Sequence, residues 1–169
     1  MSPLSNVLPR ISKTAQIIWA IAAALALSQV GTAIADDYQF FLNETDSLPN
    51  WAFWVDKNHT EPRRGDYFAF VPPANPYYPP SFRFAKQVVG VPGDHVTIRG
   101  RDFYINGQFA GTAKTHDQQG TPVQMSAPGT IPAGRYFVVT PHKDSFDSRY
   151  AIIGLIDRKM LVGKAYPVL

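Results

Sequence analysis

The sequence predicts a mostly β domain of antiparallel strands that follows one N-terminal helix long enough to cross a membrane. Residues 15–35 contain no charged side chain. After Tyr38, short apolar and aromatic runs alternate with segments rich in turn-forming residues, which is the pattern of strands joined by turns. The 15 prolines and 12 glycines favour β structure over a helical bundle. A length of 169 residues fits a single compact domain with an N-terminal segment.

The composition excludes several classes of function. A hydrophobic content of 45% and a charged content of 17% are typical of a folded domain. The net charge is only +3, and the basic residues are scattered, so no nucleic-acid partner is expected. The chain has no cysteine, which excludes disulfides, thiolate metal sites and a cysteine nucleophile. The four histidines lack metal-ligand spacing, so we expect neither a metal nor another cofactor.

The N-terminal segment has the charge pattern of a membrane span. Residues 1–14 are polar and carry two positive charges, residues 15–35 are uncharged, and two aspartates follow at once. A 21-residue helix is about 30 Å long, which matches a bilayer core. Positive charges before the span and acidic ones after it predict a cytoplasmic N-terminus. Residues 36–169 would then form a β domain on the other side of the membrane.

Residues 15–35 also admit a second interpretation, as a cleaved secretory signal. Its apolar core would run from Ile17 to Leu27, and 33–35 (Ala-Ile-Ala) would be the cleavage motif. The permanent anchor and the cleaved signal both export the domain.

The strands of the domain are predicted from their apolar and aromatic runs. Asn106-Gly107 is a strong hairpin signal between two of them. Residues 72–81 contain five prolines and are expected to form an extended surface loop, either a rigid connector or a partner-binding segment. Residues 112–129 are expected to form a long irregular loop. The predicted strands are 38–42, 51–55, 66–71, 81–91, 95–99, 102–105, 109–110, 134–140 and 160–168.

Lys86 is the first candidate for chemistry, because it lies inside an apolar strand. Phe84, Val88 and Val89 surround it in the sequence. Removal from water disfavours the ammonium form and lowers the pKa of a lysine, so that its neutral amine can act as a general base. The alternative is a strand lysine whose amine reaches solvent.

Ser47 is the candidate nucleophile. The turn around it combines Asn, Thr, Asp and Ser with a following proline, so the serine could either be presented to a substrate or cap local backbone groups. His95 and His142 could serve it as bases, but neither lies in an apolar run that would hold it rigid. A dyad of Ser47 and Lys86 has the stronger physical case, with the Ser145 hydroxyl orienting the lysine by a hydrogen bond.

Three motifs resemble those of a known family. Residues 47–49 (Ser-Leu-Pro) are similar to a nucleophile box, and 86–94 to a lysine box that ends in Gly-x-Pro-Gly-Asp. Residues 144–150 contain an Asp-Ser-Arg core. Together, and with a closing strand at 162–165, they resemble the type I signal peptidases, the S26 family of Ser-Lys serine peptidases. Leu48, where general leader peptidases usually have methionine, and the short chain favour the TraF-type conjugative-transfer branch.

The resemblance implies a fold and roles for single residues. It implies an antiparallel β domain of signal-peptidase type, with Ser47 as nucleophile and Lys86 as base. Ser145 would orient Lys86. The oxyanion hole would use the backbone N–H of Ser47 and the hydroxyl of Thr45.

Three further residues are expected to support the site structurally. Asp94 would end its turn and fix the lysine strand. Asp147 and Arg149 would form a buried ion pair that holds the late loop.

The resemblance also implies a substrate and a location. The substrate would be a polypeptide, the pilin precursor of a conjugation or type IV secretion system, and some members of the branch also join the new termini into a ring. The protein would be a single-pass protein of the cytoplasmic (inner) membrane with a periplasmic catalytic domain. The alternatives are a general signal peptidase that acts on exported preproteins and an anchored β scaffold of a secretion complex.

Overall fold

A computed structural model describes residues 12–42, 48, 50, 52–142 and 144–168 of the chain. The chain divides into two compact units, one up to Asp36 and one from Asp37 onward. Each unit is described by itself.

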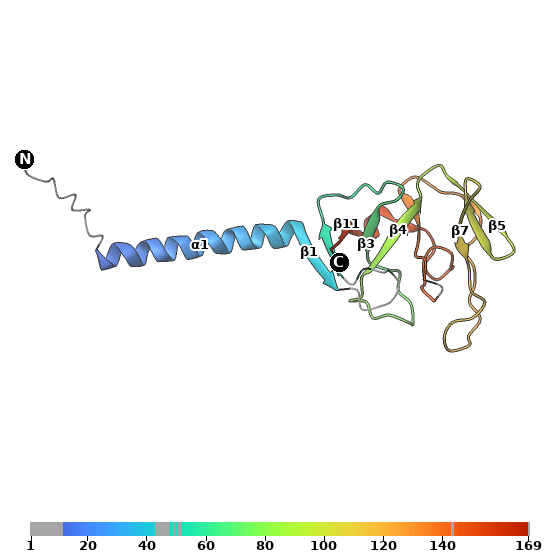
Figure 1. The fold of residues 1–169 in the computed structure, drawn as a ribbon, viewed down its shortest axis with the longest axis horizontal. Coiled ribbons are helices and arrows are strands. Elements are labelled where there is room, and N and C mark those ends of the chain that lie inside the picture. The colour runs from blue at the N-terminus through green and yellow to red at the C-terminus, as the bar shows by residue number, and fades with distance from the viewer. Residues whose placement is uncertain (1–11, 43–47, 49, 51, 143, 169) are drawn as a thin grey trace, which may run out of the picture. The chain divides into compact units, whose positions relative to one another are not determined.

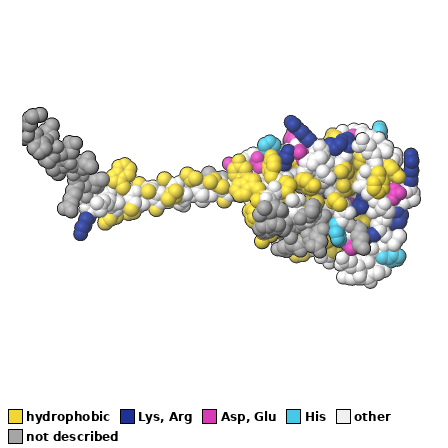
Figure 2. Space-filling view, in the orientation of Figure 1, with side chains coloured by type: hydrophobic (Ala, Val, Ile, Leu, Met, Phe, Trp, Pro, Cys, Tyr) yellow, Lys and Arg dark blue, Asp and Glu magenta, His cyan; other side chains and the backbone are white. Residues whose placement is uncertain are grey.

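The described part of the first unit is almost entirely the helix α1 (Lys13–Asp37), which ends at the first residue of the second unit. The Ser12 hydroxyl accepts a hydrogen bond from the Ala15 N–H at 3.2 Å and so caps the start of the helix, two residues before the predicted start. Apolar side chains such as Trp19 and Leu27 are 70% and 73% exposed, and Figure 2 shows them along the length of α1. Within the described residues, α1 is the one helix long and apolar enough to cross a membrane, judged by length and composition.

The second unit contains two antiparallel sheets in the part of the chain that the structure describes (Figure 1). The larger has the strand order β1-β2-β11-β3-β4-β9-β10, and the smaller has the order β7-β6-β5-β8. A 3-10 helix at Arg158–Met160 precedes the last strand. In sheet order the strands are β1 (Tyr38–Leu42), β2 (Ala52–Asp56), β11 (Leu161–Pro167), β3 (Tyr67–Phe70), β4 (Phe84–Gly90), β9 (Arg135–Val139) and β10 (Ile156–Asp157), then β7 (Gln108–Thr112), β6 (Asp102–Ile105), β5 (His95–Arg99) and β8 (Gly129–Thr130).

The predicted fold class is confirmed: the domain is mostly β with antiparallel strands, and one apolar helix precedes it. The Asn106-Gly107 turn joins β6 to β7 with positive φ at both residues, as a two-residue hairpin requires. The strand predicted over 81–91 begins only at Phe84, because the Phe82 N–H closes a turn onto the Pro79 carbonyl. Strands β8 and β10 are two residues long and have no apolar pattern by which the sequence could show them.

Strand β4 places the candidate lysine on the core side of the larger sheet. Its side chains alternate between buried and half-buried, so every second residue from Phe84 to Gly90 faces inward. The main hydrophobic core gathers aromatic and branched side chains from both sheets, among them Phe68, Phe103 and Phe137. A smaller cluster joins Leu48, Phe53, Val55, Ala69 and Ala165.

Gly163 lies where β11 departs from regular pairing with β3. A methyl group added there would overlap the Asp56 carbonyl of β2 and the backbone of Lys57. Backbone atoms cannot rotate out of the way, so we expect Gly163→Ala to lower the free energy of unfolding by about 1–3 kcal/mol. Chemical denaturation of the variant measures this change. Stability equal to that of the wild type would show that β2 and β11 can separate at this point without cost.

Candidate active site

Lys86 is buried at the centre of the larger sheet. It pairs with Phe68 of β3, its side chain is only 3% exposed, and its Nζ lies 5.0 Å from the centre of the Phe84 ring. Burial lowers the pKa of Lys86 to about 8; the Asp147 carboxylate raises it and the Arg149 guanidinium lowers it. The alternative of a strand lysine whose amine reaches solvent is therefore wrong. A substantial fraction of the Lys86 amine is neutral near physiological pH.

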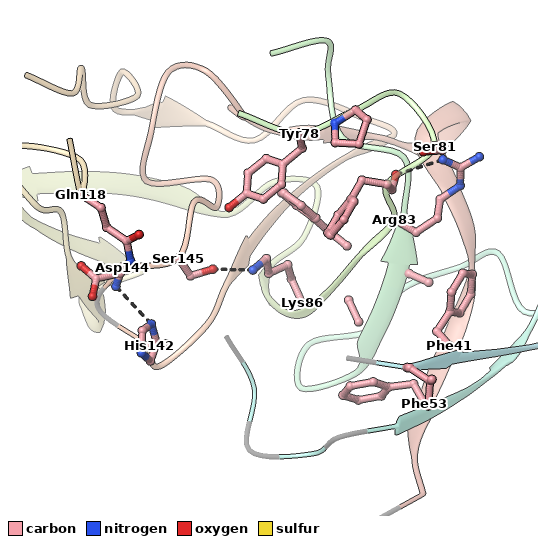
Figure 3. Close-up of a pocket in the computed structure, with 16 residues that line it drawn as sticks. Phe41, Phe53, Tyr78, Ser81, Arg83, Lys86, Gln118, His142, Asp144 and Ser145 are labelled. Carbon is pink, nitrogen blue, oxygen red and sulfur yellow. Dashed lines mark hydrogen bonds between the residues drawn. The ribbon is translucent and has the colours of Figure 1, made fainter. Parts of the chain in front are cut away.

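Ser145 meets Lys86 from the loop that follows β9. The Lys86 Nζ donates a hydrogen bond of 2.5 Å to the Ser145 Oγ, although the two residues are 59 positions apart in the sequence. Ser145 is itself buried. Figure 3 shows the two side chains pointing toward one another. The hydroxyl orients the amine, because a hydrogen bond is directional.

Asp147 and Arg149 form a buried ion pair within the same loop. The Arg149 Nη2 lies 2.7 Å from Asp147 Oδ2, and its Nε donates to Oδ1 at 2.9 Å. Arg149 also donates from Nη1 to the Thr112 carbonyl at the end of β7, and from Nη2 to the Thr140 carbonyl after β9. Two-point pairing and the backbone contacts hold the loop between the two sheets. Neither side chain lines the cleft described below.

Asp94 connects the end of β4 to the smaller sheet. Its Oδ2 accepts hydrogen bonds from the Val91 N–H at 2.7 Å and from Arg64 Nη2 at 2.6 Å. Its Oδ1 accepts one from Asn106 Nδ2 at 2.7 Å. The carboxylate closes the turn after the lysine strand and ties it to the β6–β7 hairpin, away from the cleft.

A cleft of about 560 Å³ opens beside Lys86 and Ser145. Its walls come from strands β1, β2, β3 and β4 and from three loops (Figure 3). Apolar side chains of β1 and β2 line one side, and polar side chains of the loops line the other. The lining residues are Phe41, Leu42, Phe53, Ala69, Tyr78, Pro79, Ser81, Phe82, Arg83, Phe84, Ala85, Lys86, Gln118, His142, Asp144 and Ser145.

The predicted nucleophile Ser47 and the oxyanion residue Thr45 lie outside the described residues, so their roles stay predictions. The described residues on either side of them bear on the cleft. Leu42 lines it. Leu48, which follows Ser47 directly, packs in one cluster with Phe53 and Ala69, and both of these also line the cleft.

The two histidines considered as alternative bases lie in different places. His142 lines the cleft, and its Nδ1 accepts a 3.3 Å hydrogen bond from the Asp144 N–H. His95 lies on β5 of the smaller sheet, where its Nδ1 pairs with the Thr130 hydroxyl at 2.9 Å. His142 is thus the only one of the two that lines the cleft.

Sequence reasoning missed several residues that line the cleft. Tyr78 comes from the proline-rich loop, and its ring packs edge-on against Phe84 at 4.9 Å between centres. Gln118 comes from the long loop after β7, and Arg83 directly precedes β4. Nothing in their local sequence marks them, because loops far apart in the chain meet only in the folded domain. Over the described residues, no group of three or more His, Asp or Glu side chains could hold a metal ion.

The sequence model of the family described as "Signal peptidase, peptidase S26" matches residues 12–169. The chain belongs to this family, whose members are serine peptidases of the signal peptidase type.

Three known proteins show the range of similarity. Signal peptidase I of Pseudomonas aeruginosa is 27% identical over 143 residues, which cover 64% of this chain and 49% of that protein. The conjugal transfer protein TraF of Agrobacterium fabrum is 30% identical over 175 residues, with coverage of 94% and 97%. The crystal structure of a signal peptidase I from Enterococcus faecalis shares 28% identity, covers 62% of this chain and 96% of that one, and has a TM-score of 0.42. The chain therefore spans about half the length of the Pseudomonas relative and nearly all of TraF.

Proposed function

We propose that this protein is a membrane-bound serine endopeptidase that processes the pilin precursor of a conjugation or type IV secretion system. The observation that carries the proposal is the buried Lys86 amine, with a pKa of about 8, hydrogen-bonded to Ser145 at the wall of a cleft. A buried, oriented amine that loses its proton near neutral pH is what a serine nucleophile needs as its base.

The proposed reaction proceeds through an acyl-enzyme. The Ser47 Oγ attacks the scissile carbonyl carbon while neutral Lys86 takes the hydroxyl proton. The backbone N–H of Ser47 and the Thr45 hydroxyl stabilise the oxyanion. Collapse of the tetrahedral intermediate breaks the peptide C–N bond, and Lys86 returns the proton to the leaving amine. Water, or an amine, then attacks the Ser47 ester in the same way and frees the serine.

The edge of β4 offers a place for an extended substrate. The Val88 N–H donates to the carbonyl of Asp66, the residue before β3, so the backbone groups of Val88 point toward β3. Those of Ala85, three residues earlier, point to the opposite side. On that side, pairing with β9 stops at Gln87 and Val139. Continued register would set Pro141 opposite Ala85, and proline has no N–H to donate. A substrate strand could pair with Ala85 at the cleft.

The conjugation branch of the proposal is supported by the similarity to one relative. The chain aligns with nearly the whole of a protein named for conjugal transfer. In this proposal residues 1–14 are cytoplasmic, 15–35 form a permanent anchor and 36–169 form the periplasmic catalytic domain in the inner membrane. A cleaved signal in place of the anchor would appear as a mature N-terminus near residue 36.

The second candidate function is that of a general signal peptidase, which several relatives named signal peptidase I favour. The deciding experiment incubates the purified full chain in detergent with a pilin precursor from the same conjugation system and, separately, with an exported preprotein. Cleavage of the pilin precursor alone supports the conjugation branch, and cleavage of both supports the general enzyme. Cleavage of neither, by a folded protein, would favour the anchored scaffold.

Resolution of the Ser47 ester by an amine rather than by water would join the termini of the trimmed pilin. Mass spectrometry of the product distinguishes the two outcomes, since a ring has one water less than the trimmed linear chain. A product with the full linear mass would contradict cyclisation and leave the peptidase proposal intact.

The pKa of Lys86 predicts the pH dependence of processing. The neutral amine is the active form, so kcat/KM should rise with pH through about 8 and level off above it. At pH 7 about 10% of the amine is neutral, against well under 1% for an ordinary lysine. Initial rates of precursor cleavage between pH 6 and 10 measure the profile. A flat profile from pH 6.5 to 9 would contradict Lys86 as the base.

A further inference from the structure

Lys114 lies just after β7 and contacts the loop that carries Ser145. Its Nζ donates a hydrogen bond of 2.8 Å to the carbonyl of Asp144. The same Nζ lies 4.2 Å from the centre of the Phe146 ring, a distance at which a cation is attracted to the ring face. One side chain that follows the last residue of β7 therefore contacts both neighbours of Ser145.

The backbone around Lys114 is itself held in place. The Lys114 N–H donates to the Tyr150 hydroxyl at 3.0 Å. Arg101 donates from Nε to the Ala113 carbonyl at 2.8 Å and from Nη2 to the Lys114 carbonyl. Arg149 donates to the carbonyl of Thr112. Three consecutive carbonyls thus accept hydrogen bonds from arginines. The backbone that carries the Lys114 side chain is therefore held in place.

The aromatic contacts of Phe146 hold this part of the loop less specifically than the hydrogen bond from Lys114 does. The Phe146 ring packs against Tyr77 at 4.7 Å and against Tyr150 at 5.2 Å between ring centres. Such contacts tolerate small sliding movements of the rings. The hydrogen bond from Lys114 to the Asp144 carbonyl is directional, and it lies one residue before the hydroxyl that must stay 2.5 Å from Lys86.

We propose that Lys114 is a positioning residue that holds the Ser145 hydroxyl against Lys86. The inference rests on the proposed function, because it assigns to Lys114 a part in orienting the general base. Lys114 itself is absent from the lining of the cleft and acts through Ser145.

The test is a double-mutant cycle on processing of the pilin precursor by the full chain in detergent. Lys114→Met is expected to lower kcat about tenfold and to change KM less than twofold, since the base is misplaced while the cleft is intact. Lys114→Arg keeps the charge and a donor and should recover kcat to within about threefold. In a Ser145→Ala background, Lys114→Met should cause less than a twofold further loss, because its only route of action is already gone.

Lys164→Met is the matched control. Lys164 also pairs with an oxygen, at 2.7 Å from Asp66 Oδ1, and lies 5.5 Å from the Tyr166 ring, but both of these partners lie outside the loop that carries Ser145. Its kcat should stay within twofold of the wild type. Thermal melts set an assay temperature at which every variant is folded. If Lys114→Met does not fold, Lys114→Gln replaces it in both backgrounds.

Each outcome decides between the proposals. The positioning role is overturned if Lys114→Met lowers kcat tenfold both in the wild-type background and in the Ser145→Ala background. It is also overturned if folded Lys114→Met has the kcat of the wild type. If Ser145→Ala and Lys86→Ala both process like the wild type, or if the wild type itself does not process the precursor, the proposed function fails instead. Slow processing by Ser145→Ala together with a normal Lys114→Met refutes only the inference about Lys114.

Discussion

Lys86→Met is expected to abolish processing and at the same time to make the domain more stable. Removal of the base should lower kcat about 10⁴-fold or more, and Ser47→Ala should do the same if Ser47 is the nucleophile. Quantitative precursor cleavage measures both losses. The change leaves the cleft lining otherwise intact, so substrate binding should be little affected.

The gain in stability follows from the lowered pKa of Lys86. Its pKa is about 8 in the folded protein against 10.5 for an ordinary lysine, so between these values the unfolded chain binds more protons than the folded one. Stability therefore rises with pH from 8 to 10.5, and below pH 8 burial of the amine costs about 3 kcal/mol. Methionine fills the same space without a charge and removes this cost.

Two further measurements, one on a control variant and one on Lys86→Met itself, test this interpretation. Lys164→Met should process normally, because Lys164 neither lines the cleft nor has its partners, Asp66 and Tyr166, in the Ser145 loop. Denaturation at pH 7 should show Lys86→Met above the wild type in stability. A variant that still processes would exclude Lys86 as the base and direct attention to His142, whereas a less stable variant would show that the amine makes a net favourable contribution to the core.

Arg149→Met should destabilise the domain more than any surface substitution. It removes one partner of a pair that is 4% and 0% exposed and leaves the Asp147 carboxylate buried without its cation. Loss of one partner from a buried pair costs about 3–5 kcal/mol. Arg149 also donates to backbone carbonyls on both sides of the loop, so the variant should lose processing as well.

The control for this prediction is an exposed ion pair of the same chemistry. Arg158 and Glu61 lie 2.8 Å apart with side chains 52% and 77% exposed. Arg158→Met should change the free energy of unfolding by less than about 1 kcal/mol. Urea denaturation of the two variants gives the comparison. An Arg149→Met variant that loses no more than the control would mean that water reaches Asp147 and replaces the guanidinium.

The sequence predicted much of the local structure and several partners within the site. The alternation around Lys86 indicated a strand with one buried face, and β4 has that pattern. Asn106-Gly107 predicted its hairpin because only a few residues accept positive φ at both turn positions. Ser145, Asp147 and Arg149 were found through a motif of consecutive residues. Ser47 and Thr45 rest on the same kind of signal and stay predictions.

The sequence by itself determined where the longer strands lie, that an apolar helix precedes them, and that a lysine lies on a buried strand face. These features depend on patterns within about ten residues, which local backbone preferences and burial make visible. Only the tertiary structure decided that β11 lies between β2 and β3, that Tyr78 and Gln118 line the cleft, and that Lys114 contacts the Ser145 loop. Each of these depends on how distant segments pack together, and the polar loop residues involved carry no periodic signal of the partners they will meet.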